Sequence, residues 1–275
     1  MRTKHLLIIA LAFTALAACR KNGNGNDPGS NYSLSYGDSI IYLNPGSAER
    51  IITPITPMAG KYEGFPEGIE LDEQTGAINV SKSETGLRYR ISFTPDGGSK
   101  TYTTTLLLAG VNYLDAFYFL SKNDTISKAV YNGDVAKAVP VSSGKTVFDI
   151  DLGCNNEGIA INTETGNINL MQTIRNGFFG RHPDNDSRQE FELKYKIDDK
   201  SQQARQSVKI KLYYYNTMAD VPEKYFQLLK EREGTILWAN TTHNDPTGEI
   251  ISGIAGVSGV QRAKPRPPCI FIIGR

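Results

Sequence analysis

The sequence contains two copies of one short segment, EGIELDEQTGAIN at residues 67–79 and EGIAINTETGNIN at residues 157–169. The copies align without a gap at an offset of 90 residues, and seven of the thirteen positions are identical. In each copy, apolar and polar residues alternate on both sides of a Thr-Gly pair. Alternation with period two is typical of a half-buried β-strand, and the glycine supplies the positive φ of a tight turn. Each copy therefore predicts a strand, a turn at Gly76 or Gly166, and a second strand.

Two longer alternating segments follow each copy. They occupy residues 87–93 and 102–108 after the first copy, and residues 191–197 and 208–214 after the second. One apolar and one polar face indicate antiparallel sheets with one face in water. Several short strands at regular spacing predict a mainly β chain with two tandem β-sandwich domains, each large enough for a modest core. We place these domains at residues 33–112 and 113–217.

The first copy and its flanks resemble a known family. Residues 65–78 are FPEGIELDEQTGAI, and residues 86–91 are GLRYRI. The order of proline, glycine, alternating apolar residues, aspartate, Thr-Gly turn and Gly-x-Tyr resembles the Ig/cadherin-like domains of bacterial surface proteins. The second copy has diverged, since Asn162 and Asn156 replace the aspartate and the proline. The resemblance implies tandem Ig/cadherin-like domains, which serve as spacers, adhesion modules or glycan-binding accessories.

Residues 1–18 have the composition of a lipoprotein signal peptide. A cationic start, MRTKH, precedes thirteen residues that are all apolar except Thr14, and Cys19 follows. The apolar segment is too short to span a membrane in the mature protein. Residues 16–19, LAAC, resemble the bacterial lipobox, in which the cysteine is lipidated and becomes the first residue. The resemblance implies a lipid anchor at Cys19; the alternative is an ordinary secretory signal followed by a chance cysteine.

The residues after Cys19 predict a tether and a location. Residues 20–31 are rich in Gly and Asn and contain no apolar residue, so we expect residues 19–32 to be a flexible tether. Arg20 follows the cysteine, so the aspartate associated with inner-membrane retention is absent. The acidic cluster associated with surface export of Bacteroidetes-type lipoproteins is absent as well. We therefore expect an outer-membrane lipoprotein of the cell envelope. The sequence does not decide between the cell surface and the periplasmic face of that membrane.

The charge balance limits the classes of partner. The chain of 275 residues has 30 Lys and Arg against 29 Asp and Glu, and removal of residues 1–18 takes away Arg2 and Lys4. The mature chain has a net charge of −1, so it lacks the strongly basic character typical of nucleic-acid-binding proteins, and we expect no nucleic-acid partner. No run of 18 or more apolar residues is present, so no transmembrane helix is predicted.

Residues 218–275 contain one predicted helix. Asp220 suits an N-cap, Pro222 the first turn and Gly234 the end of the helix. Its apolar face consists of Tyr225, Phe226, Leu228 and Leu229. The remaining residues are either a small appended module or further elements that complete the second domain.

An insertion in the second copy, residues 175–188, supplies the candidate ligand-binding residues. Phe178 and Phe179 lie between two glycines, and Arg181 and His182 follow. In one interpretation the rings form a loop tip that stacks on a sugar or an apolar partner. In the other, both rings fold back over the edge of a sheet.

Motifs for catalysis or for resident cofactors are missing from the sequence. No His-Glu-x-x-His, Gly-x-Ser-x-Gly, phosphate-binding glycine loop or Cys-x-x-Cys is present, so we predict no catalytic residue, metal ligand or cofactor. Calcium is the alternative, because aspartates provide suitable oxygen ligands, but the full acidic sets of cadherin junctions are not found. The aspartates considered are Asp149, Asp151, Asp184, Asp186, Asp198 and Asp199.

Two cysteines remain besides Cys19. An exported chain permits a disulfide between Cys154 and Cys269, which would tie the C-terminal segment to the second domain. We favour this pairing over two separate buried thiols.

These observations lead to three functional hypotheses. The first is a lipid-anchored, non-enzymatic envelope protein with a binding, adhesion or scaffolding role, whose partner is a polysaccharide or another envelope protein. The second is a hydrolytic enzyme or glycan-processing accessory with its site in residues 220–275, where His243 would need Asp245 or another carboxylate beside it. The third is a pair of spacers without a ligand, which burial of Phe178 and Phe179 against a sheet would favour.

Overall fold

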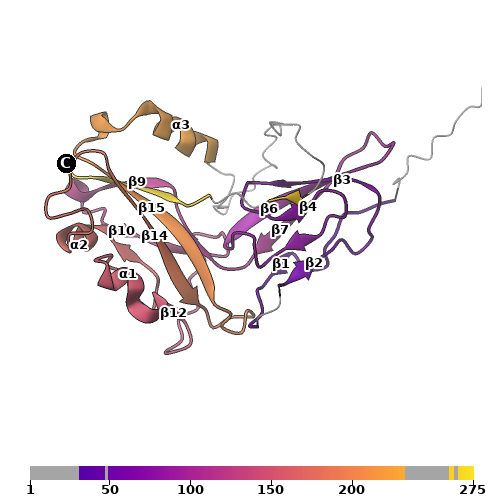
Figure 1. The fold of residues 1–275 in the computed structure, drawn as a ribbon, viewed down its shortest axis with the longest axis horizontal. Coiled ribbons are helices and arrows are strands. Elements are labelled where there is room, and N and C mark those ends of the chain that lie inside the picture. Colours follow the sequence, from indigo (N-terminus) through magenta and orange to yellow (C-terminus); the bar gives the residue numbers. More distant parts are fainter. Residues whose placement is uncertain (1–30, 47–48, 233–259, 263–265) are drawn as a thin grey trace, which may run out of the picture.

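The computed structural model describes residues 31–46, 49–232, 260–262 and 266–275. The described chain is mainly β, as predicted, and forms two units side by side along the long axis of the molecule (Figure 1). We call residues 31–110 the first unit, and residues 111–232 with 266–275 the second unit. The buried core of the first unit ends at Leu108, and that of the second begins at Val111. The Ig/cadherin-like nature of each unit and the exact domain limits stay predictions.

The larger sheet of the first unit has the strand order β1-β7-β6-β3. Its strands are β1 (Ile40–Ile41), β3 (Gly60–Phe65), β6 (Leu87–Pro95) and β7 (Tyr102–Leu108). The neighbours β3, β6 and β7 are antiparallel, whereas β1 is parallel to β7. The predicted alternation of β6 is confirmed, because its apolar residues at every second position are fully buried.

A smaller sheet of the first unit has the order β16-β4-β5-β2. It consists of β2 (Ile51–Ile52), β4 (Leu71–Asp72), β5 (Ile78–Asn79) and, from the C-terminal segment, β16 (Val260–Gln261). The predicted strand-turn-strand of the first copy is thus confirmed as β4 and β5. Side chains of this copy, including Ile69, Leu71, Ile78 and Val80, are fully buried in the core of the unit.

The second unit is built around a five-stranded sheet with the order β12-β14-β15-β17-β9. Its strands are β9 (Ala116–Phe119), β12 (Val147–Phe148), β14 (Ser187–Lys196), β15 (Gln206–Tyr215) and β17 (Cys269–Ile273). The last strand, β17, is parallel to both of its neighbours, β15 and β9. All five residues of β17 are buried, as expected for an inner strand covered on both faces.

One face of this sheet is covered by short elements. Two strand pairs are β8 (Val111–Tyr113) with β11 (Ala129–Tyr131), and β10 (Ile126–Ser127) with β13 (Ile168–Asn169). The helical turns are η1 (Leu120–Lys122), η2 (Ile150–Leu152), α1 (Gly153–Asn156) and α2 (Leu170–Arg175). Leu170 is buried as predicted, but it begins a helix instead of continuing the strand.

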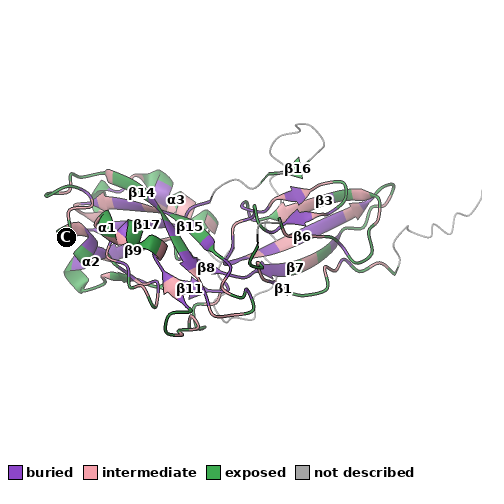
Figure 2. Cartoon of the chain, turned by 60° about the horizontal axis from the view of Figure 1, so that its bottom comes forward, coloured by how far each residue is buried: buried purple, intermediate pink, exposed green. Residues whose placement is uncertain are grey.

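The other face carries the predicted C-terminal helix. The turn η3 (Met218–Asp220) leads to α3 (Glu223–Arg232), and Figure 2 shows α3 lying along the sheet. Tyr225 of α3 is buried, and its ring lies 5.0 Å from that of Phe271 in β17. Asp220 differs from the prediction, because it lies in η3 and its carboxylate accepts hydrogen bonds from the amide and the hydroxyl of Thr217, the residue before that turn. Gly234, the predicted end of this helix, lies outside the described residues.

The two copies of the repeat form the same kind of turn, with a glycine in the left-handed region under an aromatic ring. Gly76 and Gly166 have φ values of +71° and +73°. A Cβ on Gly76 would lie 2.7 Å from the ring of Tyr62, and one on Gly166 would lie 2.6 Å from the ring of Phe148. Each ring therefore packs directly on the turn, in a space that only glycine leaves open.

Hydrogen bonding extends the repeat beyond the identical residues. Asp72 and Asn162 accept hydrogen bonds through Oδ1 from the amides two and three residues further on, so asparagine preserves the turn. The hydroxyl of Ser83 donates to the Asn79 carbonyl at 2.7 Å and accepts from the amide of Glu70. The hydroxyl of Thr173, at the same offset of 90 residues, makes the equivalent two hydrogen bonds. The duplicated segment thus reaches residue 83 in the first copy.

The C-terminal segment completes both units. Helix α3 and strand β17 belong to the second unit, whereas β16 pairs antiparallel with β4 of the first unit. Of the two alternatives from the sequence, completion of the second domain is the one observed, and the strand added to the first unit was not foreseen.

The predicted disulfide is wrong. Cys154 and Cys269 are both buried free thiols. Cys154 packs into the core on one face of the five-stranded sheet, and Cys269 packs beneath α3 on the other face. Burial raises the pKa of both thiols, that of Cys154 to about 12, so neither is a ready nucleophile.

Candidate functional site

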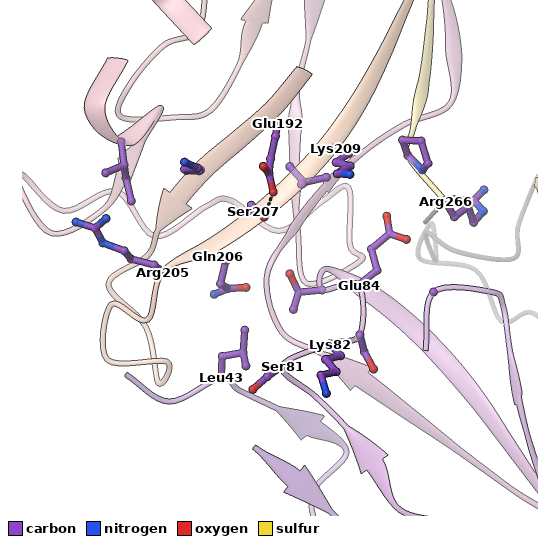
Figure 3. Close-up of a pocket in the computed structure, with 17 residues that line it drawn as sticks. Leu43, Ser81, Lys82, Glu84, Glu192, Arg205, Gln206, Ser207, Lys209 and Arg266 are labelled. Carbon is purple, nitrogen blue, oxygen red and sulfur yellow. Dashed lines mark hydrogen bonds between the residues drawn. The ribbon is translucent and has the colours of Figure 1, made fainter. Parts of the chain in front are cut away.

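A pocket of about 570 Å³ opens at the junction of the two units. One wall is formed by residues 81–85 of the first unit, and the other by the outward side chains of β14 and β15 in the second. Arg266 and Pro267 of the C-terminal segment close one side. Figure 3 shows Arg205, Gln206, Ser207 and Lys209 on one side of the pocket, with Ser81, Lys82 and Glu84 opposite.

The wall from the second unit follows from strand alternation. Leu193 and Val208 face each other across the strand pair and point into the core. Their neighbours 192, 194, 207 and 209 point to the opposite face of the sheet. Farther along β15 that face is covered by α3, but next to the first unit it is open and lines the pocket.

The wall from the first unit is fixed by the repeat. The hydroxyl of Ser83 is held by the two hydrogen bonds described above, which anchor this loop on β5. Lys82 forms an ion pair with Glu49 at 2.8 Å. The loop after β5 therefore presents side chains to the junction from a defined backbone.

Gln206 contributes a buried amide side chain to the lining of the pocket. Its side chain is 6% exposed, and its Oε1 accepts a hydrogen bond from the hydroxyl of Tyr195 at 3.2 Å. Its Nε2 has no hydrogen-bond partner among the described residues. A buried donor without a partner costs free energy, so a ligand that accepts this hydrogen bond would be favoured.

Tyr195 connects Gln206 to the first unit. The hydroxyl lies 3.2 Å from Oγ1 of Thr85 in the first unit, and it accepts a hydrogen bond from the amide of Val111 in its own unit at 2.8 Å. The ring is fully buried and stacks on Phe148. The base of the pocket is therefore a hydrogen-bonded contact between the two units.

Glu84 lies at the same junction, and its carboxyl is largely removed from solvent. Burial raises the pKa of its carboxyl to about 7, although the charge of Arg266 and a hydrogen bond from Asn112 oppose the shift. Oε2 has no hydrogen-bond partner within the described chain. A Cβ at Gly68 would lie 2.9 Å from this oxygen, so glycine leaves room for the carboxyl. Glu84 therefore binds a proton more readily than an ordinary glutamate.

Arg266 is held beside the pocket by Asp115. The guanidinium is 7% exposed, and its Nη2 lies 3.0 Å from Oδ2 of Asp115. Oδ1 of Asp115 accepts from Arg232 at 2.8 Å and from the amide of Cys269 at 2.7 Å. Burial lowers the pKa of Arg266, and the charge of Asp115 opposes that shift.

The pocket is predominantly basic. Two acidic residues, Glu84 and Glu192, line it together with five basic ones: Lys82, Lys194, Arg205, Lys209 and Arg266. Lys82 and Arg266 are in ion pairs, whereas Lys194, Arg205 and Lys209 are exposed and form no ion pair with any described residue. Three free cations therefore face the pocket.

The candidate loop from the sequence is not part of this pocket. Phe179 is 8% exposed and Phe178 is half-buried; both rings pack on the core of the second unit, Phe178 against Phe191. Of the two interpretations, the rings folded back over the sheet are observed, and the exposed stacking platform is wrong. Arg181 and His182 are exposed, and a binding role for them stays a prediction.

Two of the candidate calcium ligands, Asp149 and Asp186, are engaged in other contacts. No group of three or more His, Cys, Asp and Glu side chains in the described residues is arranged to hold a metal ion. Asp149 accepts hydrogen bonds from the amides of Cys154 and Asn155, and Asp186 binds Arg188.

The other predicted features lie elsewhere in the chain. Cys19, the signal peptide and His243 are outside the described residues. Within the described part, no helix is both long and apolar enough to cross a membrane.

Sequence reasoning missed the pocket, because no motif marks it. The only signal was the run of lysines at alternate positions on the polar faces of residues 194–196 and 209–211. Nothing in the sequence showed that the first unit and residue 266 would lie beside them.

The comparisons with known proteins give little further information. No family model matches the chain, and no curated protein matches its sequence. One solved structure with a partial likeness is a SusE-like, surface-located polysaccharide-binding protein from the heparin utilisation locus of Bacteroides thetaiotaomicron. The likeness has 12% identity and a TM-score of 0.21, and it covers 68% of this chain and 35% of that protein. A TM-score this low does not establish a shared fold.

Proposed function

We propose that this protein is a lipid-anchored, non-enzymatic binding protein of the cell envelope, and that its junction pocket binds a segment of polysaccharide. The lipidated residue is Cys19, and the anchor places the protein at the outer membrane. The observation that carries the proposal is the junction pocket, which is lined mainly by polar and charged side chains and includes Gln206, whose buried Nε2 has no hydrogen-bond partner among the described residues.

The chemistry of the lining favours a ligand rich in hydroxyl groups. The pocket volume of about 570 Å³ is in the range of small-molecule sites. Ser81, Ser207, Gln206 and Glu84 supply hydroxyl, amide and carboxyl groups, which exchange hydrogen bonds with sugar hydroxyls. Few apolar side chains line the pocket, so an envelope protein with an apolar docking surface is the less favoured partner.

The connections between the units support binding by a preorganised site. The hydroxyl of Tyr195 joins both units at the base, and β16 joins the C-terminal segment to the first unit. A site held in place before the ligand arrives loses less conformational entropy on binding.

A second candidate function is hydrolysis of a glycosidic bond. Glu84 and Glu192 are two carboxyl groups in one pocket, and a pKa of about 7 suits Glu84 as a proton donor. In this case the protein would release new reducing ends from a polysaccharide, and Glu84→Gln would abolish the release. A constant number of reducing ends during prolonged incubation would exclude it.

The binding proposal is tested by filling the pocket. Ser207 is exposed on the pocket wall, so Ser207→Trp places a large ring in the cavity without disturbing the core. Thr103→Trp is the matched control, because Thr103 is exposed on β7 and does not line the pocket. We expect affinity electrophoresis in gels that contain neutral or acidic polysaccharides to show retardation of the wild type and of Thr103→Trp, but not of Ser207→Trp. Equal retardation of both variants would contradict the proposal.

A further inference from the structure

We propose that the polysaccharide segment is acidic, and that Lys194, Arg205 and Lys209 bind its carboxylate or sulfate groups. This inference rests on the function proposed above, and it names the chemical class of the ligand.

The three cations form a row on one face of the sheet. Lys209 is in β15 and Arg205 directly precedes that strand, so Arg205, Ser207 and Lys209 are at alternate positions, about 7 Å apart. Lys194 of β14 is directly opposite Ser207 in the register. Figure 3 shows Arg205 and Lys209 on either side of Ser207 and Gln206. A row of charges suits a chain with repeated anionic groups better than a single small anion.

None of the three cations on this row forms an ion pair with a residue that the structure describes. Glu192, opposite Lys209, accepts a hydrogen bond from the hydroxyl of Ser207 at 2.6 Å. Lys211 shows the contrast: it lies two residues beyond Lys209, outside the pocket, and is paired with Glu190 at 3.5 Å. Free cations of these strands therefore face the pocket, where a polyanion would find them.

Hydrogen-bond donors in the pocket also favour a ligand with anionic groups. The unpartnered Nε2 of Gln206 is a donor, and the amide is 94% buried, since only 6% of it is exposed. The buried guanidinium of Arg266 adds further donors at the side of the pocket. An acceptor-rich ligand satisfies such groups, and carboxylates and sulfates carry acceptors only.

The test compares three polysaccharide probes of similar length: polygalacturonate, dextran sulfate and neutral dextran. Binding of the mature protein is measured by isothermal titration at low and at moderate ionic strength. The pocket variant is Arg205→Gln with Lys209→Gln, and the matched control is Lys211→Gln on the same strand and face. All three substitutions are at positions with side chains in contact with solvent, and unchanged thermal midpoints establish that the variants are folded.

We expect at least one acidic probe to bind more tightly than dextran, with affinity that falls as salt rises. The double variant should lose at least about tenfold in affinity, or about 1.4 kcal/mol, while Lys211→Gln stays near the wild type. Equal affinity for dextran, or equal losses in the two variants, would overturn the inference. If dextran binds and Ser207→Trp abolishes that binding, the proposed function survives without an acidic ligand; if no probe and no other polysaccharide binds, both proposals fail.

Discussion

Asp115 and Arg266 are 151 residues apart in sequence, yet their side chains form an ion pair of 3.0 Å at the junction of the two units. The same carboxylate binds Arg232 at the end of α3 and the amide of Cys269 at the start of β17. One acidic side chain therefore joins the region before β9, the C-terminal helix and the C-terminal strand, and it positions the arginine that borders the pocket.

Removal of this carboxylate should be strongly destabilising. Asp115→Ala leaves Arg232 and the 7%-exposed Arg266 without their shared partner and removes the acceptor of the Cys269 amide. Loss of one partner of a buried ion pair typically lowers the free energy of unfolding by about 3–5 kcal/mol. Urea unfolding measures this change.

A surface pair provides the control for Asp115. Glu190→Ala breaks the exposed ion pair with Lys211, and such pairs contribute about 0–1 kcal/mol. Similar losses in the two variants would show that the Asp115 cluster is no more important for stability than a surface contact.

The turn glycines of the repeat should respond alike in both units. Gly76→Ala and Gly166→Ala impose a positive φ on alanine and push a Cβ within 3 Å of an aromatic ring. The combined cost should be about 2–4 kcal/mol of unfolding free energy in each case. Gly97→Ala is the control, since Gly97 has φ of +72° but nothing within 4 Å, and should cost only about 1 kcal/mol. Three equal values would refute the close packing of the rings on the turns.

Glu84 should make stability depend on pH. Its pKa is about 7 in the folded protein against 4.5 ordinarily, so the folded state binds more protons between these values. The favourable contribution is full below pH 4.5 and is lost as pH rises through 7, a change of about 3 kcal/mol. We therefore expect Glu84→Gln to exceed the wild type in unfolding free energy at pH 8, with a smaller difference at pH 5. Glu192→Gln is the control variant, because Glu192 is exposed. If the stability of Glu84→Gln depended on pH in the same way as that of the wild type, the raised pKa of Glu84 would be contradicted.

The two phenylalanines should matter for stability, not for binding. Phe179→Ala opens a cavity beside Tyr214 and should lower the free energy of unfolding by about 3 kcal/mol. Arg181→Ala, in the same exposed loop, should change it by less than about 0.5 kcal/mol. If Phe179→Ala lost polysaccharide binding while its stability was unchanged, the ligand would bind at this loop and not at the junction pocket.

The sequence was informative where structure is local. The alternation of residues 87–93 and 208–214, the Thr-Gly turns and the apolar face of α3 each reflect contacts between near neighbours, and these elements were predicted correctly. The repeat also predicted the same Thr-Gly turn twice, whereas two related domains stay a prediction.

Features that depend on distant contacts were not predictable. Strand β17 lies between β15 and β9, and nothing local indicates that a terminal strand is placed inside a sheet. The same insertion orients Cys269 towards α3, which explains why it cannot meet Cys154. The pocket was missed for the same reason, since Glu84, Gln206 and Arg266 meet only through the packing of the two units.

The most direct test of the account is the binding of polysaccharides to the mature protein with Ser207→Trp and Thr103→Trp in parallel. The account predicts saturable binding by the wild type and by Thr103→Trp, and its loss in a folded Ser207→Trp. Binding that persists in Ser207→Trp would contradict a site at the junction, and absence of binding by the wild type to every polysaccharide would contradict the proposed function itself.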